Sequence, residues 1–208
     1  MIFYQATPWE VGNFIPRTLI ARKNLRLEIS REQAEILIGC ILGDAYITKR
    51  RQVVIEQSLK QKEYLHWKFE KLKSISYPGI SNVKRFDKRY NKTYSSCTFV
   101  LRQYFRPWRE IFYKDGRKIF PQNLSLTPLS IATWYMDDGC YGDRQCILSL
   151  DGFDQMSRDC IQRMLCDVHG VETILRASGK LLIRKKSERH FFFIIKPFII
   201  PCMRYKIS

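Results

Sequence analysis

Two apolar, helix-length segments of this 208-residue chain each end in an aspartate. The first runs from Leu37 to Asp44 and the second from Ile131 to Asp138, so the two aspartates lie 94 positions apart. Packing alone does not explain why an apolar helix should be duplicated together with the acid at its end. A polar residue also recurs 13 positions after each aspartate, as Gln57 and as Asp151. The sequence therefore predicts two related halves with one acid each.

Both segments carry helix start and stop signals. Ser30 and Gln33 form a capping box before the first, and apolar residues then recur at helical spacing up to the aspartate. Before the second, Thr127 is followed by Pro128, the residue favoured at the first helical position. Gly139 stands where a glycine in the left-handed conformation would end that helix. We expect the two helices to begin and end in matching ways.

Strand-like and helical segments then follow in the same order in both halves. In the first half we expect strands at 52–57, 81–86 and 93–101 and helices at 61–75 and 103–113. In the second half we expect strands at 145–150, 171–176 and 180–186 and helices at 154–168 and 190–200. The order in each half is approximately αββαββα, which is an α+β arrangement.

This organisation divides the chain into an N-terminal extension, residues 1–29, and two halves, residues 30–126 and 127–208. We expect the halves to meet through their leading helices, because both helices carry small residues that let two backbones approach closely. These residues are Gly39, Gly43, Ala132 and Thr133.

Composition narrows the class of partner. Thirty-six Lys and Arg residues against 20 Asp and Glu give a formal charge of +16, which favours a polyanion such as nucleic acid. The seven cysteines include no Cys-x-x-Cys pair, so we expect buried thiols in a reducing, intracellular compartment and no zinc site. The longest apolar run, residues 191–200, is too short to span a bilayer, and residues 1–29 show no secretory signal.

The paired acids suggest a chemistry. An aspartate at the C-terminus of a helix faces the negative end of the helix dipole, so it is unfavourable without a counter-charge. If the two helices pack side by side with their ends level, Asp44 and Asp138 converge and can hold hard cations such as Mg²⁺. Such cations activate water and stabilise the charged oxygens in phosphodiester hydrolysis.

The segments from Leu37 to Ala45 and from Ile131 to Gly139 resemble the paired motifs of the LAGLIDADG homing endonucleases, in the single-chain form that carries both copies. The resemblance covers about residues 30–208. It implies two pseudo-symmetric αββαββα halves, with saddle-shaped antiparallel sheets that lie in the DNA major groove and a central two-helix interface. It also implies a monomer that cuts both strands of a long, specific DNA target.

The same resemblance assigns the metal ligands. Asp44 and Asp138 would hold Mg²⁺ or Mn²⁺, whereas Asp137, one position earlier, is not an implied ligand. The backbone carbonyls of Ala45 and Gly139 are further candidates. Ala45 replaces the glycine that usually follows the first acid, which is a mild cost if the position is left-handed.

Three further side chains are candidate catalytic residues. Lys118 and Lys206 match positions where single-chain members place basic residues beside the metals, and an ammonium there would orient water or offset charge on the phosphate. Gln57 fits the polar residue that members of the family usually carry after the strand that follows the first motif. Asp151 stands at that place in the second half, so the resemblance leaves equal chemistry on the two DNA strands in doubt.

Basic residues in and beside the expected strands are candidate DNA contacts, since a sheet with helices behind it can present such side chains to a duplex. They occur in both halves, as a long pseudo-symmetric footprint requires. The candidates are Lys49, Arg50, Arg51, Lys84, Arg85, Lys88, Arg89, Arg144, Arg176, Arg184 and Lys186.

Two other functions stay open. A non-catalytic nucleic-acid binder on the same scaffold, such as an RNA maturase or a DNA-binding regulator, would keep the charge and the fold. A ribosomal-type structural protein would explain the charge but not the two matched acids. The target sequence and an origin in an intron or an intein are not readable from residue spacing.

Overall fold

The computed structural model describes residues 25–207, so most of the expected extension at 1–29 lies outside the described residues. By its contacts the described chain forms two compact units. Unit 1 comprises Glu35–Gly43 and residues 107–207, and unit 2 comprises residues 25–34 and Asp44–Arg106. The predicted halves at 30–126 and 127–208 follow the sequence repeat rather than these contacts, and their boundaries remain a proposal.

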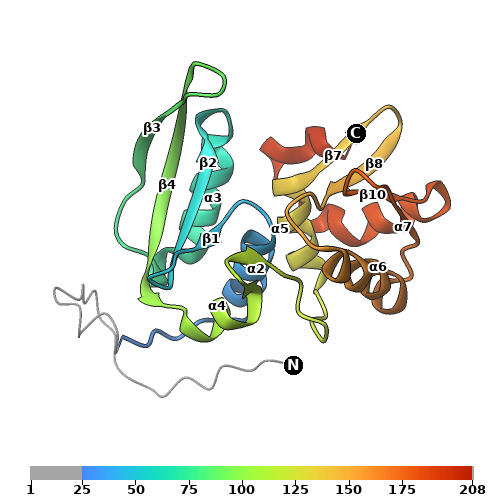
Figure 1. Ribbon diagram of the computed structural model, residues 1–208, viewed down its shortest axis with the longest axis horizontal. Helices are drawn as coiled ribbons and strands as arrows, with labels where there is room; N and C mark the ends of the chain where they lie inside the picture. Colours follow the sequence, from blue (N-terminus) through green and yellow to red (C-terminus); the bar gives the residue numbers. More distant parts are fainter. Residues whose placement is uncertain (1–24, 208) are drawn as a thin grey trace. The chain divides into compact units, whose positions relative to one another are not determined.

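Unit 2 is built on an antiparallel sheet with the strand order β1-β2-β4-β3 (Figure 1). The strands are β1 (Tyr46–Ile47), β2 (Gln52–Ser58), β3 (Ser81–Asp87) and β4 (Lys92–Tyr104). The helix α3 (Lys62–Leu72) covers one face of this sheet, where the rings of Phe69 and Phe99 meet edge to face at 5.3 Å. Alternate residues of β2, and of β4 from Cys97 to Leu101, are buried, as the period of two in their sequences predicts.

Unit 1 contains a second antiparallel sheet with the matching order β7-β8-β10-β9. Its strands are β7 (Gly139–Gly142), β8 (Gln145–Ser149), β9 (Thr173–Leu175) and β10 (Lys180–Ile183). The helices around them are α5 (Pro128–Asp138), α6 (Gln155–His169) and α7 (Lys185–Ile195), while α4 (Arg106–Phe112) and the short hairpin of β5 (Tyr113–Lys114) and β6 (Arg117–Lys118) precede α5. Both halves thus follow the predicted αββαββα order.

The helix start signals act as expected. In the capping box before α2 (Arg31–Leu42), the Ser30 amide donates to Gln33 Oε1 and the Gln33 amide donates to Ser30 Oγ, each at 3.2 Å. Thr127 caps α5 by accepting from the Ser130 amide, and Pro128 is the first residue of that helix. Within residues 25–207, no helix has the length and apolar character needed to cross a membrane.

Three local expectations were wrong. Gly139 is extended, with φ −84° and ψ 156°, and is not a left-handed cap. A Cβ there would lie 2.3 Å from the Tyr135 ring, so space and not backbone angle requires the glycine. The strand expected at 180–186 ends at Ile183, and the helix expected at 190–200 begins already at Lys185, because the exposed basic residues there form the first turn of an amphipathic helix.

Inside unit 1, the part of α2 from Glu35 to Gly43 packs closely against α5. A Cβ on Gly39 would lie 2.6 Å from the Ser130 carbonyl oxygen and 2.7 Å from Thr133 Cβ. One turn later, a Cβ on Gly43 would lie 2.5 Å from Asp137 Cβ. The Ser130 hydroxyl also donates to the Glu35 carbonyl at 2.9 Å. The two apolar helices therefore touch along their length, up to the C-terminal end of each.

We predict that Gly39→Ala destabilises the protein by about 1–3 kcal/mol, because the new methyl group overpacks a rigid backbone contact. Gly152→Ala is the matched control, since a Cβ at Gly152 would meet no other part of residues 25–207 within 4 Å, and it should change stability by less than about 0.5 kcal/mol. Urea unfolding followed by circular dichroism measures both. Equal effects of the two substitutions would contradict the close helix contact.

Candidate functional site

Asp44, the first aspartate, is hydrogen-bonded to Gln57, one of the predicted catalytic residues. Asp44 is exposed and lies two positions beyond the end of α2. The Gln57 side-chain amide donates to Asp44 Oδ2 at 2.9 Å. Gln57 is only 3% exposed, on the inner face of β2, so its amide is held in place by the packing of unit 2. A neutral donor thus fixes the orientation of this carboxylate without neutralising its charge.

The second aspartate is oriented by a different residue. Asp138 is the last residue of α5 and is half-buried. The Trp134 indole Nε1–H donates to Asp138 Oδ2 at 3.2 Å, across one turn of the same helix. Trp134 is not among the predicted site residues, although its place four positions before the acid could have indicated it.

The registers of the two hairpins that follow the aspartates explain why the two halves orient their aspartates with different residues. Tyr46, two positions after the first aspartate, pairs with Val54, ten positions after it. Cys140, two positions after the second aspartate, pairs with Ile147, only nine positions after it. The β7-β8 hairpin closes through a two-residue turn. In the β1-β2 hairpin the Thr48 amide still donates to the Gln52 carbonyl at 2.8 Å, which leaves a turn of three residues, 49–51. Equal spacing in the sequence therefore does not mean equal position in the ladder.

By this register, the structural counterpart of Gln57 is Leu150 and not Asp151. Leu150 is fully buried and carries no donor. The Asp151 carboxylate instead accepts from Lys180 Nζ at 2.8 Å and from Ser149 Oγ at 2.9 Å. These hydrogen bonds, with that from Lys180 the strongest, lower the pKa of Asp151 below its usual value. Asp151 is thus ionised and paired with a cation of the neighbouring strand.

The two predicted lysines occupy equivalent places in unit 1. Lys118 Nζ donates to the carbonyl of Gly43, and Lys206 Nζ donates to the carbonyl of Asp137 at 2.8 Å. Each lysine therefore binds the residue immediately before one of the two aspartates. Ammonium groups at helix C-termini also offset the negative end of the helix dipole. The lysines contribute positive charge at both helix ends whether or not they take part in chemistry.

The available donors fit a hard divalent cation. Carboxylate and backbone carbonyl oxygens are the ligands that Mg²⁺ prefers, and Asp44 presents such a carboxylate to solvent. Ala45 is buried and does not have a positive φ, so alanine carries no left-handed strain there. Gly139 is the first residue of β7. Within residues 25–207, no three or more His, Cys, Asp or Glu side chains form a group that could hold a metal ion.

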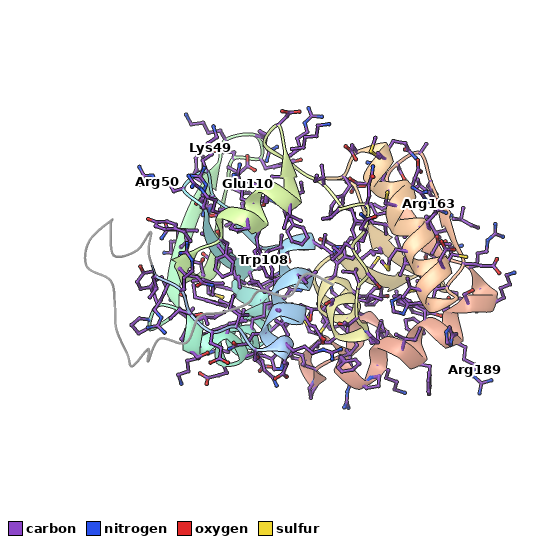
Figure 2. All side chains as sticks on the ribbon, turned by 90° about the horizontal axis from the view of Figure 1, so that it is seen from below. Lys49, Arg50, Trp108, Glu110, Arg163 and Arg189 are labelled. Atoms are coloured by element: carbon purple, nitrogen blue, oxygen red, sulfur yellow. The ribbon has the colours of Figure 1, made fainter. Side chains whose placement is uncertain are left out.

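The candidate DNA contacts of unit 2 do not share one surface. Arg85 lies on the face of the sheet opposite α3, since it pairs with Tyr94, whereas Lys84 points to the α3 side of the same strand. Lys49 and Arg50 are exposed in the β1-β2 loop, where Figure 2 shows their side chains pointing outward. The remaining candidates of this unit lie in turns: Arg51 has φ 68°, and Lys88 and Arg89 belong to the β3-β4 loop.

The candidate DNA contacts of unit 1 are exposed. Arg144 lies in the β7-β8 turn with φ 59°. Arg176 follows β9 and donates to Gln145 Oε1 at 3.4 Å. Arg184 and Lys186 both face Glu172, at 3.8 Å and 2.6 Å. Two of the four cations are therefore partly neutralised by one carboxylate.

An ion pair organises the open face of the unit 2 sheet. Arg85 Nε and Nη2 donate to the two oxygens of Glu56 at 3.1 Å and 2.8 Å, and the Ser96 hydroxyl donates to the same carboxylate. The hydrogen bond from Arg85 is the main cause that lowers the pKa of Glu56. A carboxyl whose pKa is lowered on folding stabilises the folded state above its unfolded pKa, and this stabilisation is lost as the pH falls through the folded pKa.

We therefore predict that Glu56→Gln lowers the free energy of unfolding at about pH 7 and that this difference shrinks as the pH falls to about 3. Urea unfolding of both proteins at a series of pH values measures the difference. A difference that stays constant over this range would contradict the ion pair.

We also predict that Lys206→Met destabilises the protein by about 1–3 kcal/mol, because the substitution leaves a partly buried carbonyl without its charged donor. Lys206 is 8% exposed, whereas Lys196 is exposed and provides the matched control in Lys196→Met. Thermal unfolding compares the two. Equal stability of the two variants would show that Lys206 does not hold the end of α5.

Comparisons with known proteins show which proteins the chain is similar to. "Protein RecA" of Mycolicibacterium flavescens is 27% identical to the chain over 209 residues, covering 86% of the chain and 47% of that protein. "Cytochrome b mRNA maturase bI2" of Saccharomyces cerevisiae is 23% identical, covering 83% and 46%, and its Debaryomyces hansenii namesake is 24% identical, covering 89% and 77%. The chain spans about half the length of the first of these curated relatives.

The fold also matches a solved structure. The homing endonuclease I-WcaI, bound to its DNA recognition sequence, superposes with a TM-score of 0.80 at 22% identity, covering 96% of this chain and 95% of that one. This likeness establishes the α+β fold. The profile of the LAGLIDADG DNA endonuclease family matches residues 34–191, which include both apolar segments that end in an aspartate and both four-stranded sheets. The chain therefore belongs to the LAGLIDADG DNA endonuclease family.

Proposed function

We propose that the chain is a site-specific endonuclease that hydrolyses both strands of a DNA duplex with divalent metal ions, Mg²⁺ or Mn²⁺. The observation that carries the proposal is the matched construction at the ends of α2 and α5. Each helix delivers an aspartate, a donor orients that aspartate, and a lysine binds the carbonyl of the residue before it. A structural protein does not require an oriented aspartate and a lysine at matching positions of two helices.

The helix contact in unit 1 supports a shared site. Gly43 touches Asp137 at the ends of the two helices. Asp44 and Asp138 are the next residues of the chain, one peptide bond beyond this contact, and consecutive Cα atoms are about 3.8 Å apart. We propose that the two carboxylates meet there, with the carbonyls of Ala45 and Gly139 as further metal ligands.

The roles of the side chains follow from their chemistry. Bound divalent ions would activate water and stabilise charge on the attacked phosphate. Gln57 keeps the Asp44 carboxylate in one orientation, so its lone pairs are directed before a ligand arrives. Lys118 and Lys206 place an ammonium beside each helix end, where it orients water or offsets charge that develops on the phosphate.

The partner we propose is double-stranded DNA with a long recognition sequence, bound by one copy of the chain. The formal charge of +16 and the exposed basic loops of both sheets supply the electrostatic attraction. The similarity to I-WcaI, which was solved bound to its DNA recognition sequence, supports the same class of ligand. We further propose a reducing, intracellular compartment and an origin in an intron or intein.

A second candidate function is assistance of RNA maturation. Two relatives of the chain are named cytochrome b mRNA maturases, and they cover 83% and 89% of it. Such a role needs the fold and the basic surface but no cleavage of DNA. A randomised duplex library separates the two functions, because an endonuclease cuts members of the library in Mg²⁺ and a pure binder only selects them.

We predict that Asp44→Asn and Asp138→Asn each abolish double-strand cleavage, with a loss of at least about 100-fold, while DNA affinity stays within a few-fold of wild type. Asp167→Asn is the matched control, because Asp167 is an exposed acid of α6, and it should cut at the wild-type rate. Cleavage of library-selected DNA in Mg²⁺, with binding measured in Ca²⁺, provides both values.

Full double-strand cleavage by either aspartate variant would refute the proposed site. Loss of cleavage together with loss of binding would instead assign the aspartates to DNA recognition or folding. A wild-type protein that selects DNA sites but cuts none of them in Mg²⁺ or Mn²⁺ would favour the maturase or another binding function.

A further inference from the structure

We propose that Trp134 is a positioning residue for Asp138 and that its indole N–H does in the second half what the Gln57 amide does in the first. The inference rests on the proposed nuclease function, which it deepens by dividing the site into two halves that are held by different chemistry. Its starting point is the pair of hydrogen bonds to the two aspartates, at 2.9 Å from Gln57 and at 3.2 Å from Trp134.

The indole is suited to this task. Its Nε1–H is a donor only, so it can bind the carboxylate in just one sense and has no acceptor role to compete. Trp134 is 1% exposed, and its ring packs edge to face on Phe153 with the centroids 5.9 Å apart. A ring fixed in this way holds its N–H in one direction. The Asp138 carboxylate is thereby given a preferred rotamer by its own helix.

The register difference explains why a new donor is present. The β7-β8 hairpin is one residue shorter than its counterpart, which places Leu150 where the first half has Gln57. Leucine cannot donate a hydrogen bond, so the sheet of unit 1 offers no amide from that position. At the position of α2 that corresponds to Trp134, 94 residues earlier, the chain has Cys40. The donor that binds the aspartate therefore lies on a strand in the first half and on a helix in the second.

Because different donors hold the two aspartates, a substitution can disturb one aspartate and leave the other in place. Loss of the indole N–H should disorder Asp138 and leave the Gln57 to Asp44 hydrogen bond, which lies in unit 2, unchanged. Residues that orient metal ligands typically contribute about 10- to 100-fold to activity or metal affinity. Because each aspartate belongs to one half of a pseudo-symmetric site, each support should affect one DNA strand more than the other.

The first experiment measures cleavage of each strand separately, on a duplex carrying a different label on each strand. Trp134→Phe should lower the cleavage rate of one strand by about 10-fold or more, with the other strand and DNA affinity within a few-fold of wild type. Gln57→Leu, which gives the first half the residue of the second, should slow the opposite strand. Trp108→Phe, at a tryptophan 8% exposed on α4 (Figure 2), controls for the loss of buried ring volume.

The second experiment needs neither metal nor DNA. In protein carrying ¹⁵N-labelled tryptophan, Asp138→Ala should shift the Trp134 indole N–H resonance and speed its hydrogen exchange, because the acceptor is gone. The Trp108 indole resonance should not move. Trp134→Phe assigns the resonance by removing it. A purely packing role for Trp134 predicts no such coupling to the carboxylate.

The outcomes separate this inference from the function on which it rests. If wild type cuts DNA but Trp134→Phe slows both strands equally, or if Asp138→Ala leaves the indole resonance in place, the positioning role is wrong and the nuclease function stands. If wild type cuts no DNA, the nuclease function fails, and the role of Trp134 in cleavage fails with it even where the resonance shifts.

Discussion

The contact between α2 and α5 in unit 1 is the constraint on which the proposed site depends. Glycines at positions 39 and 43 let the backbones approach so closely that a single methyl group would collide with Ser130, Thr133 or Asp137. The close approach brings the C-terminal ends of both helices to one place, and the acids follow directly in the chain. The lysines then bind the carbonyls of Gly43 and Asp137, at the C-terminal ends of the two helices. The close packing of the helices and the charged groups of the proposed site therefore involve the same few residues.

Much of this architecture could be predicted from the sequence, because its signals are local. Capping residues located the starts of α2 and α5, and the period of two located β2, β4 and β8 to within a few residues. The two-residue strand β1 and the four-residue strand β7 were not located, since strands so short carry too little periodic signal. The conformation of Gly139 escaped prediction for a related reason: the sequence shows that a glycine is present but not whether space or backbone angle requires it.

The site was harder to predict than the fold. Sequence spacing matched Gln57 with Asp151, but a hairpin one residue shorter moved the ladder by one position, and a shift of one residue exchanges the two faces of a strand. Asp151 consequently pairs with Lys180, and the buried Leu150 takes the matching place. Trp134 was not singled out, since a tryptophan in an apolar helix is usually a core residue, as Trp134 also is, and only its place one turn before the acid indicated a second role. Pseudo-symmetry in the chain therefore produced equivalent helices and lysines, but not equivalent support for the two acids.

The most direct test of the central claim is a crystal structure of the protein with its DNA target and Mn²⁺, in which anomalous scattering locates the metal. The proposed function predicts manganese within coordination distance of the carboxylates of both Asp44 and Asp138 and of a scissile phosphate, as one shared ion or as neighbouring ions about 4 Å apart. Carboxylates more than about 10 Å apart, with no manganese between them, would contradict the proposed nuclease site.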